Sequence, residues 1–358
     1  MYIVLMAGGV GTRFWPMSRR ANPKQLLKIV GTKTMLRLTF DRVKSLTDPD
    51  HILIITGKDL KKAIETEIPE VPVQNIIGEP VGRNTAPCIG LAAAIIAARG
   101  DHAEPMVVLP ADHLISDTKN FQNTLKVGLE CAAEKNCLLT IGIKPTYPET
   151  GYGYIQLGKE IYNKSRKKIY RVKTFAEKPN LDTAERFLKS GDFLWNSGMF
   201  IWRTETILNE IDEYIPELRQ DLEHLQKSYG SAKFKRVLAD VYSRTKPISV
   251  DYGVMEAARN VCMVEAKFNW NDLGSWEAVY NISPKDRNKN VIHAKGSILL
   301  NSADNYFYTK KKIIAAVNID NLVVVDMDDA LLICQKDQSQ DVKEIVEYLS
   351  RKGMNKYL

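Results

Sequence analysis

Short apolar runs alternate with longer segments of helical period over the first 143 residues of the chain. Residues 2–6, 52–56, 75–78, 106–109 and 138–143 are typical of strands, and residues 35–46, 60–68, 85–99 and 121–134 are typical of helices. Strands separated by helices form βαβ units, whose right-handed crossovers place the strands parallel in one sheet. The runs Ile52–Ile55 and Val107–Leu109 are apolar at every position, which indicates a sheet covered on both faces. We therefore predict an α/β fold with a mostly parallel central sheet.

The pattern changes after residue 150. Residues 151–157 and 169–175 predict two strands that pair antiparallel, and the basic run Lys164-Ser165-Arg166-Lys167-Lys168 between them predicts a solvated loop. A helix at 181–188, a strand at 198–202 and further helices up to about residue 258 follow. We expect these antiparallel strands to be inserted into the parallel α/β pattern.

A polar, charged segment at residues 284–290 marks a change in composition. Short β segments without intervening helices follow it, at 291–293, 297–300, 305–308, 313–317, 322–326 and 330–334, and residues 340–349 form an amphipathic helix pattern. Close spacing of this kind predicts a small β domain with a solenoid-like stack. We predict two domains, residues 1–284 and residues 285–358, the second ending in a helix.

The first apolar run leads into a turn of small residues, Ala7-Gly8-Gly9-Val10-Gly11-Thr12, which Arg13 follows directly and Lys24 follows eleven residues after Arg13. A glycine loop after a strand exposes backbone N–H groups to an anion, because no side chains stand in the way. An Arg and a Lys supply the positive charge that a polyphosphate requires. The stretch therefore predicts binding of a nucleoside triphosphate.

Two better-known glycine loops do not fit this stretch. A Walker A loop requires Lys and Ser or Thr after its second glycine, whereas Thr12-Arg13 follows Gly11. A dinucleotide fingerprint counted from Gly9 requires a third glycine where Phe14 stands, which argues against a nicotinamide dehydrogenase.

Polar residues also follow two other predicted strands. Ligands of open α/β sheets bind beyond the carboxyl ends of the strands. The polar loop that starts at Glu79 and contains Asn84 follows one strand, and Asp112 follows another. Glu79 and Asn84 offer donors and acceptors to a purine edge, and Asp112 is a candidate ligand for a hard cation. Asp272, in a segment between two tryptophans, is the best candidate for a second acid, although a lone aspartate more often caps a helix or turn.

Composition and charge exclude several other classes of protein. The net charge of +7 reflects 50 basic against 43 acidic residues, a mild excess that suits small anionic substrates at least as well as nucleic acid. The five cysteines form no Cys-x-x-Cys pair, which argues against a disulfide framework or a structural zinc site. No apolar run reaches the roughly 18 residues of a membrane-spanning helix, and the chain starts directly with a strand. We predict a cytoplasmic protein without nucleic-acid or membrane partners.

These motifs and several others, in order along the chain, resemble the sugar nucleotidyltransferase family and, within it, the mannose-1-phosphate guanylyltransferase branch. The resemblance is carried by Gly9–Arg13 with Pro23-Lys24, Glu79–Pro87, Leu109–His113, Gly151–Ile155, Phe175–Pro179, Trp195–Phe200, Ser249–Glu256 and Trp270–Trp276. It extends from residue 2 to about residue 280, and Asp326–Ile333 resembles the family's tail domain more weakly. It implies a Rossmann-like nucleotidyltransferase domain.

The resemblance also implies an activity and a role for each motif residue. The reaction would convert GTP and α-D-mannose 1-phosphate to GDP-mannose and diphosphate, with Mg²⁺ held by Asp112 and Asp272. Arg13 and Lys24 would hold the triphosphate and Lys178 the sugar phosphate. The nucleotide would contact Gly8, Gly9, Gly11, Thr12, Glu79, Asn84, Thr85 and Ala86, and the sugar would contact Gly153, Glu177 and Asn196.

The implied chemistry requires no general base. A phosphate monoester has a second pKa of about 6, so it is largely dianionic near neutral pH and is already a nucleophile. Its in-line attack on the α-phosphorus is limited by charge repulsion, which positioning and positive charge relieve. The absence of a Ser/His/Asp or Cys/His constellation from the sequence motifs agrees with this chemistry.

Several alternatives stay open from the sequence. The transferase could use another base or hexose 1-phosphate, or the fold could serve a non-catalytic nucleotide-sugar sensor. Lys178 could be an exposed lysine with Glu177 as its ion-pair partner, and Asp251 could cap a helix or touch substrate. The β domain could form a homodimer. Since the sequence ends soon after that domain, we also expect no isomerase domain of the cupin type.

Overall fold

The computed structural model describes residues 1–164 and 167–358, and these residues group into two compact units. The sheet unit comprises Met1–Gly8, Thr39–Ala111 and Ile115–Trp270, and the solenoid unit comprises Gly9–Leu38, Asp112–Leu114 and Asn271–Leu358. The glycine turn from Gly9 onward and Asp112 thus belong to the same unit as the C-terminal β segments. The predicted sequence boundary between residues 284 and 285 stays a prediction.

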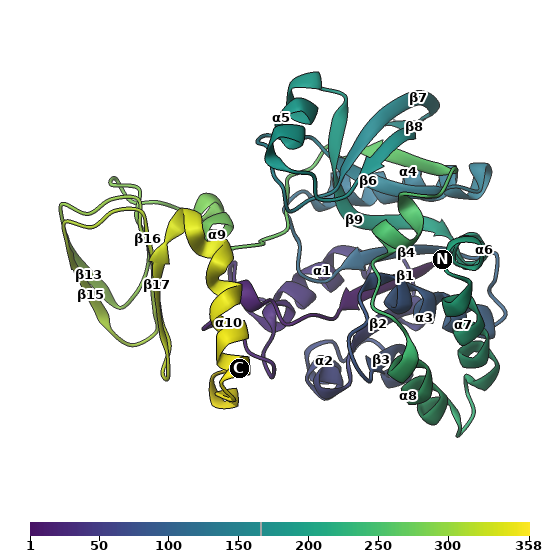
Figure 1. Cartoon of the computed structure of the whole chain (residues 1–358), viewed down its shortest axis with the longest axis horizontal. Helices are drawn as coiled ribbons and strands as arrows, with labels where there is room; N and C mark the ends of the chain where they lie inside the picture. Colours follow the sequence, from purple (N-terminus) through teal and green to yellow (C-terminus); the bar gives the residue numbers. More distant parts are fainter. Residues whose placement is uncertain (165–166) are drawn as a thin grey trace. The chain divides into compact units, whose positions relative to one another are not determined.

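One sheet of nine strands forms the centre of the sheet unit, in the order β3-β2-β1-β4-β9-β6-β10-β8-β7. Its strands are β1 (Tyr2–Ala7), β2 (Ile52–Gly57), β3 (Ile76–Glu79), β4 (Pro105–Pro110), β6 (Leu138–Ile143), β7 (Tyr154–Lys164), β8 (Lys167–Ala176), β9 (Phe193–Arg203) and β10 (Val261–Glu265). Strands β3, β2, β1 and β4 are parallel, and so are β6 and β10. Strand β9 runs antiparallel to both of its neighbours β4 and β6, and β7 and β8 form the long antiparallel hairpin seen in Figure 1. The predicted α/β class, with inserted antiparallel strands, is confirmed.

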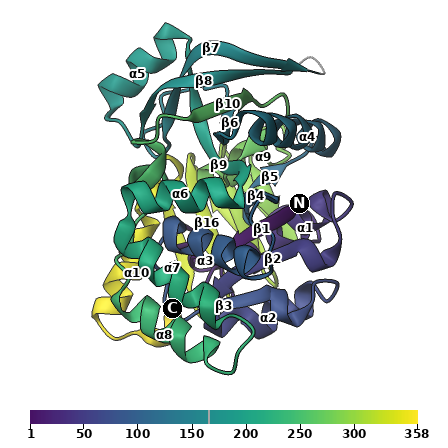
Figure 2. The ribbon, with the colours of Figure 1, turned by 90° about the vertical axis from the view of Figure 1, so that its right-hand side faces the viewer.

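Helices cover both faces of this sheet. They are α2 (Lys61–Glu67), α3 (Thr85–Ala98), α4 (Thr118–Lys135), α5 (Leu181–Ser190), α6 (Thr204–Tyr214), α7 (Pro216–Ser228) and α8 (Phe234–Arg244), whereas α1 (Met35–Val43) begins in the solenoid unit. Alternate side chains of β9 show the two faces: Phe200 and Trp202 join the core under α3, whereas Ile201 lies against Gly128 of α4. Helices α3, α6 and α7 lie together on one side of the sheet (Figure 2).

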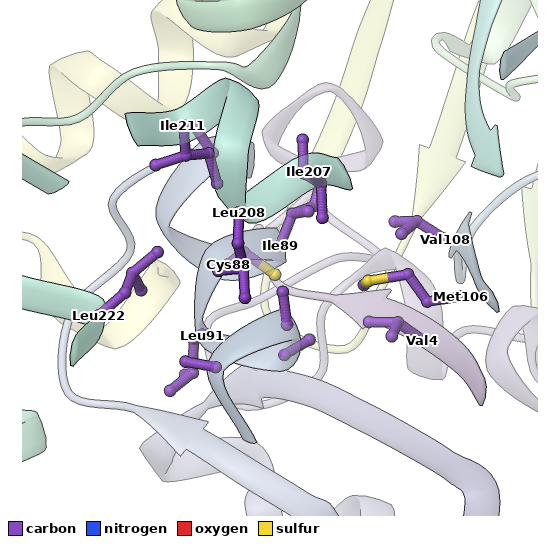
Figure 3. Packing of buried hydrophobic residues seen from close by; sticks show 14 of the residues in the cluster. Val4, Cys88, Ile89, Leu91, Met106, Val108, Ile207, Leu208, Ile211 and Leu222 are labelled. Atoms are coloured by element: carbon purple, nitrogen blue, oxygen red, sulfur yellow. The ribbon is translucent and has the colours of Figure 1, made fainter. Parts of the chain in front are cut away.

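Helix α3 is buried on all sides, since its residues from Ala86 to Ala97 are all buried. A helix without a polar face must lie between apolar layers, and α3 packs against β1, α6 and α7. Figure 3 shows the packing, in which Ile207, Leu208 and Ile211 of α6 and Leu222 of α7 approach Cys88, Ile89 and Leu91 of α3, next to Val4, Met106 and Val108 of the sheet. The uninterrupted apolar strands of the sequence are explained by this two-sided burial.

The short strands of the solenoid unit pair in parallel except the last one, which runs antiparallel to the strand before it. They are β12 (Val291–His293), β13 (Gly296–Leu300), β14 (Tyr306–Thr309), β15 (Ile313–Val317), β16 (Leu322–Asp326) and β17 (Leu331–Gln335), with helices α9 (Trp276–Ile282) and α10 (Val342–Arg351). Parallel pairing joins β12 to β14, β14 to β16 and β13 to β15, as in a coil that returns to the same face. The buried Asn305 links successive turns by donating to Asn290 Oδ1 (3.0 Å) and accepting from the Leu322 backbone (2.9 Å). The predicted solenoid-like domain that ends in a helix is confirmed.

Asparagine and aspartate form the corners of this coil. Asn301 and Asn318 have φ of 46° and 54°, and Asp304 and Asn321 have φ of 57° and 58°. These side chains tolerate the left-handed backbone region better than other non-glycine residues. Both pairs are 17 residues apart, the same offset as the pairing of Ser297 with Ile314 in β13 and β15. The sequence therefore carries a repeat that its hydrophobic pattern alone does not reveal.

The structure differs from the sequence-based expectations at two other places. Strand β10 is not among the predicted strands, yet it lies inside the sheet, and its run from Val261 to Val264 is buried. Of the basic run predicted to be a solvated loop, residues 165 and 166 lie outside the described residues. Lys164 ends β7 and is exposed, but Lys167 begins β8 and is buried, and burial lowers the pKa of its ammonium. The loop prediction is wrong for Lys164, Lys167 and Lys168, because all three lie in the paired strands β7 and β8, although Lys164 and Lys168 are exposed as predicted.

Packing of α7 on α3 supports a stability prediction. Leu222 is 1% exposed, and its side chain fills the space above Gly90, where an added Cβ would lie 2.7 Å from Leu222 Cδ1. Replacing Leu222 with alanine leaves a cavity, so we expect a loss of about 2–5 kcal/mol in the free energy of unfolding. Gln220→Ala, on the exposed face of the same helix, should change it by less than about 0.5 kcal/mol. Urea unfolding followed by circular dichroism measures both; a loss below about 1 kcal/mol for Leu222→Ala would contradict this packing.

Candidate functional site: a phosphate cradle and three buried carboxylates

The glycine turn after β1 adopts a conformation that requires glycine. Gly9 and Gly11 have φ of 86° and 66°, in the left-handed region. A Cβ on Gly11 would lie only 2.4 Å from Lys24 Cβ. Gly11 therefore permits Lys24 to approach the turn, which continues directly into the 3-10 helix Thr12–Phe14 that carries Arg13.

Lys24 connects three segments that are distant in the sequence. Its side chain is 8% exposed, and its Nζ donates to Asp112 Oδ2 at 2.7 Å and to the main-chain oxygen of Asp272 at 2.6 Å. A buried ammonium must be paired, because the cost of removing it from water is otherwise large. Burial opposes ionisation of Asp112, but the charges of Lys24 and His113 and its hydrogen bonds outweigh that effect and lower its pKa. The carboxylate of Asp112 is therefore ionised at neutral pH.

A cavity of about 380 Å³ lies over this pair in the solenoid unit. The sequence-predicted residues that line it are Gly11, Thr12, Arg13, Lys24, Asp112 and Asp272, together with Val10, Phe14, His113, Leu273 and Gly274. The Asp272 carboxylate is held by its own turn: Oδ1 accepts from the Gly274 backbone at 3.1 Å, and Leu273 has a φ of 48°. The structure thus brings both cations and both aspartates of the predicted phosphate and metal site to one cavity.

The donor set of the cavity suits a hard divalent cation. Two carboxylates line it, and across the described parts of the chain no group of three or more His, Cys, Asp or Glu side chains is placed to hold a metal. Mg²⁺ characteristically takes one or two carboxylates and completes its shell with water and phosphate oxygens, so two aspartates beside the predicted phosphate-binding turn fit it. His113 Nε2 lies 4.0 Å from Asp112 Oδ1 and adds positive charge next to that carboxylate when protonated.

Two residues of the predicted nucleotide set, Gly8 and Glu79, lie at the carboxyl ends of β1 and β3 in the sheet unit. A Cβ on Gly8 would lie 3.6 Å from Glu79 Oε2. Glu79 is buried, and its Oε1 accepts from the Tyr242 hydroxyl at 2.9 Å. Burial raises the pKa of Glu79 to about 7, and the Tyr242 hydrogen bond opposes that rise. Tyr242 is a partner that the sequence patterns did not single out.

Asn84, Thr85 and Ala86, also predicted to contact the nucleotide, form the N-terminus of α3. Asn84 has φ of 69° and caps the helix through its side chain, which accepts from Thr85 N at 2.8 Å. Thr85 Oγ1 accepts from Val250 N at 2.8 Å, and Ala86 N donates to the Ile248 carbonyl. These polar groups order the loop by fixing it to residues 248–250, and any nucleotide contact would use their remaining hydrogen-bonding capacity.

The three predicted sugar-binding residues lie together in the sheet unit. Asn196 N donates to the Gly153 carbonyl at 2.8 Å, and a Cβ on Gly153 would lie 2.4 Å from Glu177 Oε2. Only glycine leaves room for the carboxylate there. Glu177 Oε2 is buried and accepts no hydrogen bond within the structure. A buried carboxylate oxygen without a partner is unusual in a native protein and points to a ligand that donates to it.

Lys178 pairs with the other oxygen of the same carboxylate, because its Nζ lies 2.9 Å from Glu177 Oε1. The Lys178 side chain is 54% exposed, so the ion-pair alternative from the sequence is present in the structure. The Lys178 backbone has a φ of 48°, a strained conformation for a lysine that precedes a proline. Such strain clusters at ligand-binding positions, where surrounding contacts impose it.

Asp251, whose role was left open by the sequence, lies beside the sugar-binding set. It begins a short π-helix, Asp251–Met255, and its Oδ1 accepts from Asn196 Nδ2 at 2.7 Å. Burial and the nearby charge of Glu177 raise the pKa of Asp251 to about 6, against the Asn196 hydrogen bond. Thr140 donates to Asn196 Oδ1 at 2.9 Å, so the orientation of the Asn196 amide is set from both sides.

Comparison with known proteins gives consistent results for both units. Residues 2–289 match the family model of nucleotidyl transferases, and residues 295–349 match that of the mannose-phosphate isomerase/GMP-like β-helix domain. Mannose-1-phosphate guanylyltransferase RfbM from Salmonella typhimurium is 40% identical over 99% of this chain and 73% of its own length. A mannose-1-phosphate guanylyltransferase from Escherichia coli is 36% identical, over 99% of this chain and 76% of its own length.

A solved structure from Thermus thermophilus, named a mannose-1-phosphate geranyltransferase, is similar along nearly the whole chain. It has a TM-score of 0.87 and 32% identity, and the match covers 98% of this chain and 99% of that one. Among the helices of the described residues, none has the length and apolar character needed to span a membrane.

The environment of Glu79 leads to a pH-dependent prediction. Its pKa is about 7 in the folded protein against an ordinary value of 4.5. Between pH 4.5 and 7 the folded chain therefore holds a proton that the unfolded chain releases, so this group lowers the stability of the folded protein as pH rises through that window. Glu79→Gln cannot ionise and still accepts from Tyr242, so it should be more stable than wild type by about 3 kcal/mol at pH 8 and nearly equal to it at pH 4.5.

Urea unfolding at a series of pH values measures this difference. Glu185→Gln, at an exposed position of α5, provides a matched control whose stability difference from wild type should not change with pH. A Glu79→Gln difference that is constant from pH 4.5 to pH 8 would show that burial does not raise the Glu79 pKa.

Proposed function

Since the chain belongs to the mannose-1-phosphate guanylyltransferase family of nucleotidyl transferases, we propose that it converts GTP and α-D-mannose 1-phosphate to GDP-mannose and diphosphate. The observation that carries the proposal is the placement of Arg13, Lys24, Asp112 and Asp272 around one cavity beside a glycine turn. Two cations and two carboxylates at one phosphate cradle are what transfer of a nucleotidyl group requires.

The proposed division of roles follows the charges. Arg13 and Lys24 hold the triphosphate and neutralise the diphosphate as it leaves, and the N–H groups of the glycine turn hold its phosphate oxygens. Asp112 and Asp272 hold Mg²⁺, which when bound supplies Lewis-acid charge neutralisation at the reacting phosphates. The Asp112–Lys24 ion pair keeps that carboxylate ionised and ready to bind the cation.

For the sugar phosphate we propose Lys178, Glu177, Gly153 and Asn196. The buried Glu177 Oε2 has no donor in the structure, so it is suited to accept from a sugar hydroxyl. Lys178 pairs with the other Glu177 oxygen and is more than half exposed, which leaves its ammonium accessible to a phosphate. The sugar phosphate itself is the nucleophile and is already dianionic, so no residue is required to remove a proton.

Base recognition is proposed for Glu79 with Gly8 and the Asn84–Ala86 segment. Glu79 accepts from Tyr242 and has a pKa near neutrality, so it can present either a carboxylate or a carboxylic acid to a purine edge.

We also propose a cytoplasmic location, supported by five cysteines that are all free thiols, four of them buried. The predicted homodimer stays a prediction.

Diphosphate release tests the reaction directly. The protein is incubated with Mg²⁺, mannose 1-phosphate and each nucleoside triphosphate in turn, and diphosphate is measured. We expect rapid release with GTP and release at least about tenfold slower with ATP, CTP or UTP. Glucose 1-phosphate in place of mannose 1-phosphate tests the sugar. No release with GTP would refute the proposed transferase and favour a nucleotide-sugar sensor, and equal release with ATP would refute guanine specificity.

The two aspartates are tested by substitutions that keep shape and remove charge. Asp112→Asn and Asp272→Asn should each lower kcat at least about 100-fold, because positioned charge at a transferring phosphate contributes several kcal/mol. Asp337→Asn, at an exposed position of the same unit, should leave kcat within about twofold of wild type. A near-normal kcat for either of the first two variants would remove that residue from the metal site.

A further inference from the structure

The last residues of the chain lie against the loop that follows the glycine turn, and both belong to the solenoid unit. The Trp15 indole Nε1 donates to the Tyr357 carbonyl at 2.9 Å, and the Arg19 guanidinium donates to the same oxygen. Arg20 N donates to the Leu358 carbonyl at 2.7 Å. One short segment, residues 355–358, thus accepts three hydrogen bonds from residues 15–20.

Apolar packing reinforces these hydrogen bonds. The Leu358 side chain is 9% exposed and belongs to the same buried cluster as Phe14 and Trp15. Helix α10, which precedes the segment, packs on the 3-10 helix that carries Arg13. Arg19 has a second fixed partner in Asp329, with Nη2 and Oδ1 2.9 Å apart. Residues 355–358 are therefore part of the core around the loop.

Residues 15–20 are in turn hydrogen-bonded to the phosphate-binding turn. Ser18 Oγ donates to the Gly11 carbonyl at 2.7 Å, and Trp15 N donates to the Thr12 carbonyl at 3.1 Å. The Trp15 carbonyl accepts from Trp276 Nε1 at 3.3 Å, four residues after Asp272. Trp15 therefore connects the C-terminal segment with both the turn that precedes Arg13 and the chain segment that carries Asp272.

The turn needs such support for a physical reason. Glycine-rich loops lose the most conformational entropy on ordering, and a 3-10 helix of three residues contributes little stability of its own. A loop that is ordered only when the ligand binds subtracts that entropy cost from the affinity. External hydrogen bonds that order it beforehand therefore raise the affinity for the phosphate group it binds.

We propose that residues 355–358 are positioning residues for the nucleotide: through Trp15 and Arg19 they hold the phosphate-binding turn in its binding conformation. The inference rests on the proposed function in naming GTP as the ligand of that turn. It assigns the C-terminal segment a role in GTP affinity and none in binding of the sugar phosphate, since its hydrogen bonds come from Trp15, Arg19 and Arg20, in the loop that follows Arg13.

Three variants test the proposal, two that each remove one hydrogen-bond donor and one that removes all of the acceptors. Trp15→Phe removes the indole donor and keeps an aromatic ring, Arg19→Met removes the guanidinium and keeps the length of the side chain, and a chain without residues 355–358 removes all of these acceptors. Arg351→Met is the matched control, because it removes an exposed arginine from α10 that makes none of these bonds. Each is assayed for kcat, for the KM of both substrates and for the thermal unfolding midpoint.

We expect KM for GTP to rise about three- to tenfold in Trp15→Phe and Arg19→Met, where tenfold corresponds to about 1.4 kcal/mol of binding free energy. The rise should be larger in the shortened chain. KM for mannose 1-phosphate should stay within about twofold in the two point variants, and Arg351→Met should match wild type. Equal increases of both KM values, or a lower unfolding midpoint with an unchanged KM for GTP, would show a merely structural role.

Hydrogen exchange gives a second readout that does not depend on turnover. Amides of residues 9–18 should exchange faster in the two point variants than in wild type, whereas those of α3 should not change. If wild type releases no diphosphate from GTP, the proposed function fails, and the exchange data still decide the positioning role. Unchanged exchange over residues 9–18 in both point variants would overturn it.

Discussion

The candidate site depends on the burial of one ammonium group. Lys24 is almost inaccessible to solvent, and its Nζ is satisfied by the Asp112 carboxylate and the Asp272 main chain. Because a buried charge is stable only with such partners, Lys24 determines where the chain segments around residues 112 and 272 must lie. The glycine at position 11 is explained by the same constraint, since any Cβ there would overlap with the Lys24 side chain. The Lys24–Asp112 ion pair thus fixes two of the charged groups that line the cavity.

The sheet unit places its buried carboxyl groups next to strand ends and loops. Glu79 ends β3 and accepts from Tyr242, and Glu177 follows β8 with one oxygen that accepts no hydrogen bond from the described residues. Asp251 lies near Glu177 and shares the Asn196 amide with Thr140. Burial of these groups raises the pKa of Glu79 and of Asp251, which is the expected result where charged forms lose water without gaining a cation. Strongly perturbed carboxyl groups of this kind are typical of ligand-binding regions.

Much of the fold could be predicted because the relevant signals are local. The alternation of apolar strands with helices led to the α/β class, and the short β segments led to the solenoid-like domain. Strand β10 was missed because five residues with an apolar run do not distinguish a strand from a loop that packs on the core. The 17-residue spacing of Asn301 with Asn318 was missed because backbone corners, and not apolar positions, carry it. The partners Tyr242 and Asp251 depend on contacts across more than 50 residues of chain, for which the sequence has no spacing rule.

The sequence by itself determined the class of fold, and it predicted an anion-binding glycine turn and the cations and acids proposed for phosphate and metal, because strand periodicity, glycine and charge act locally. Only the tertiary structure decided that Lys24 lies between Asp112 and Asp272, that Asn84 and Thr85 use polar groups to order their own loop, and that Trp15 and Arg19 donate to the Tyr357 carbonyl. These arrangements arise from burial, because a buried polar group without a hydrogen-bond partner destabilises the folded chain.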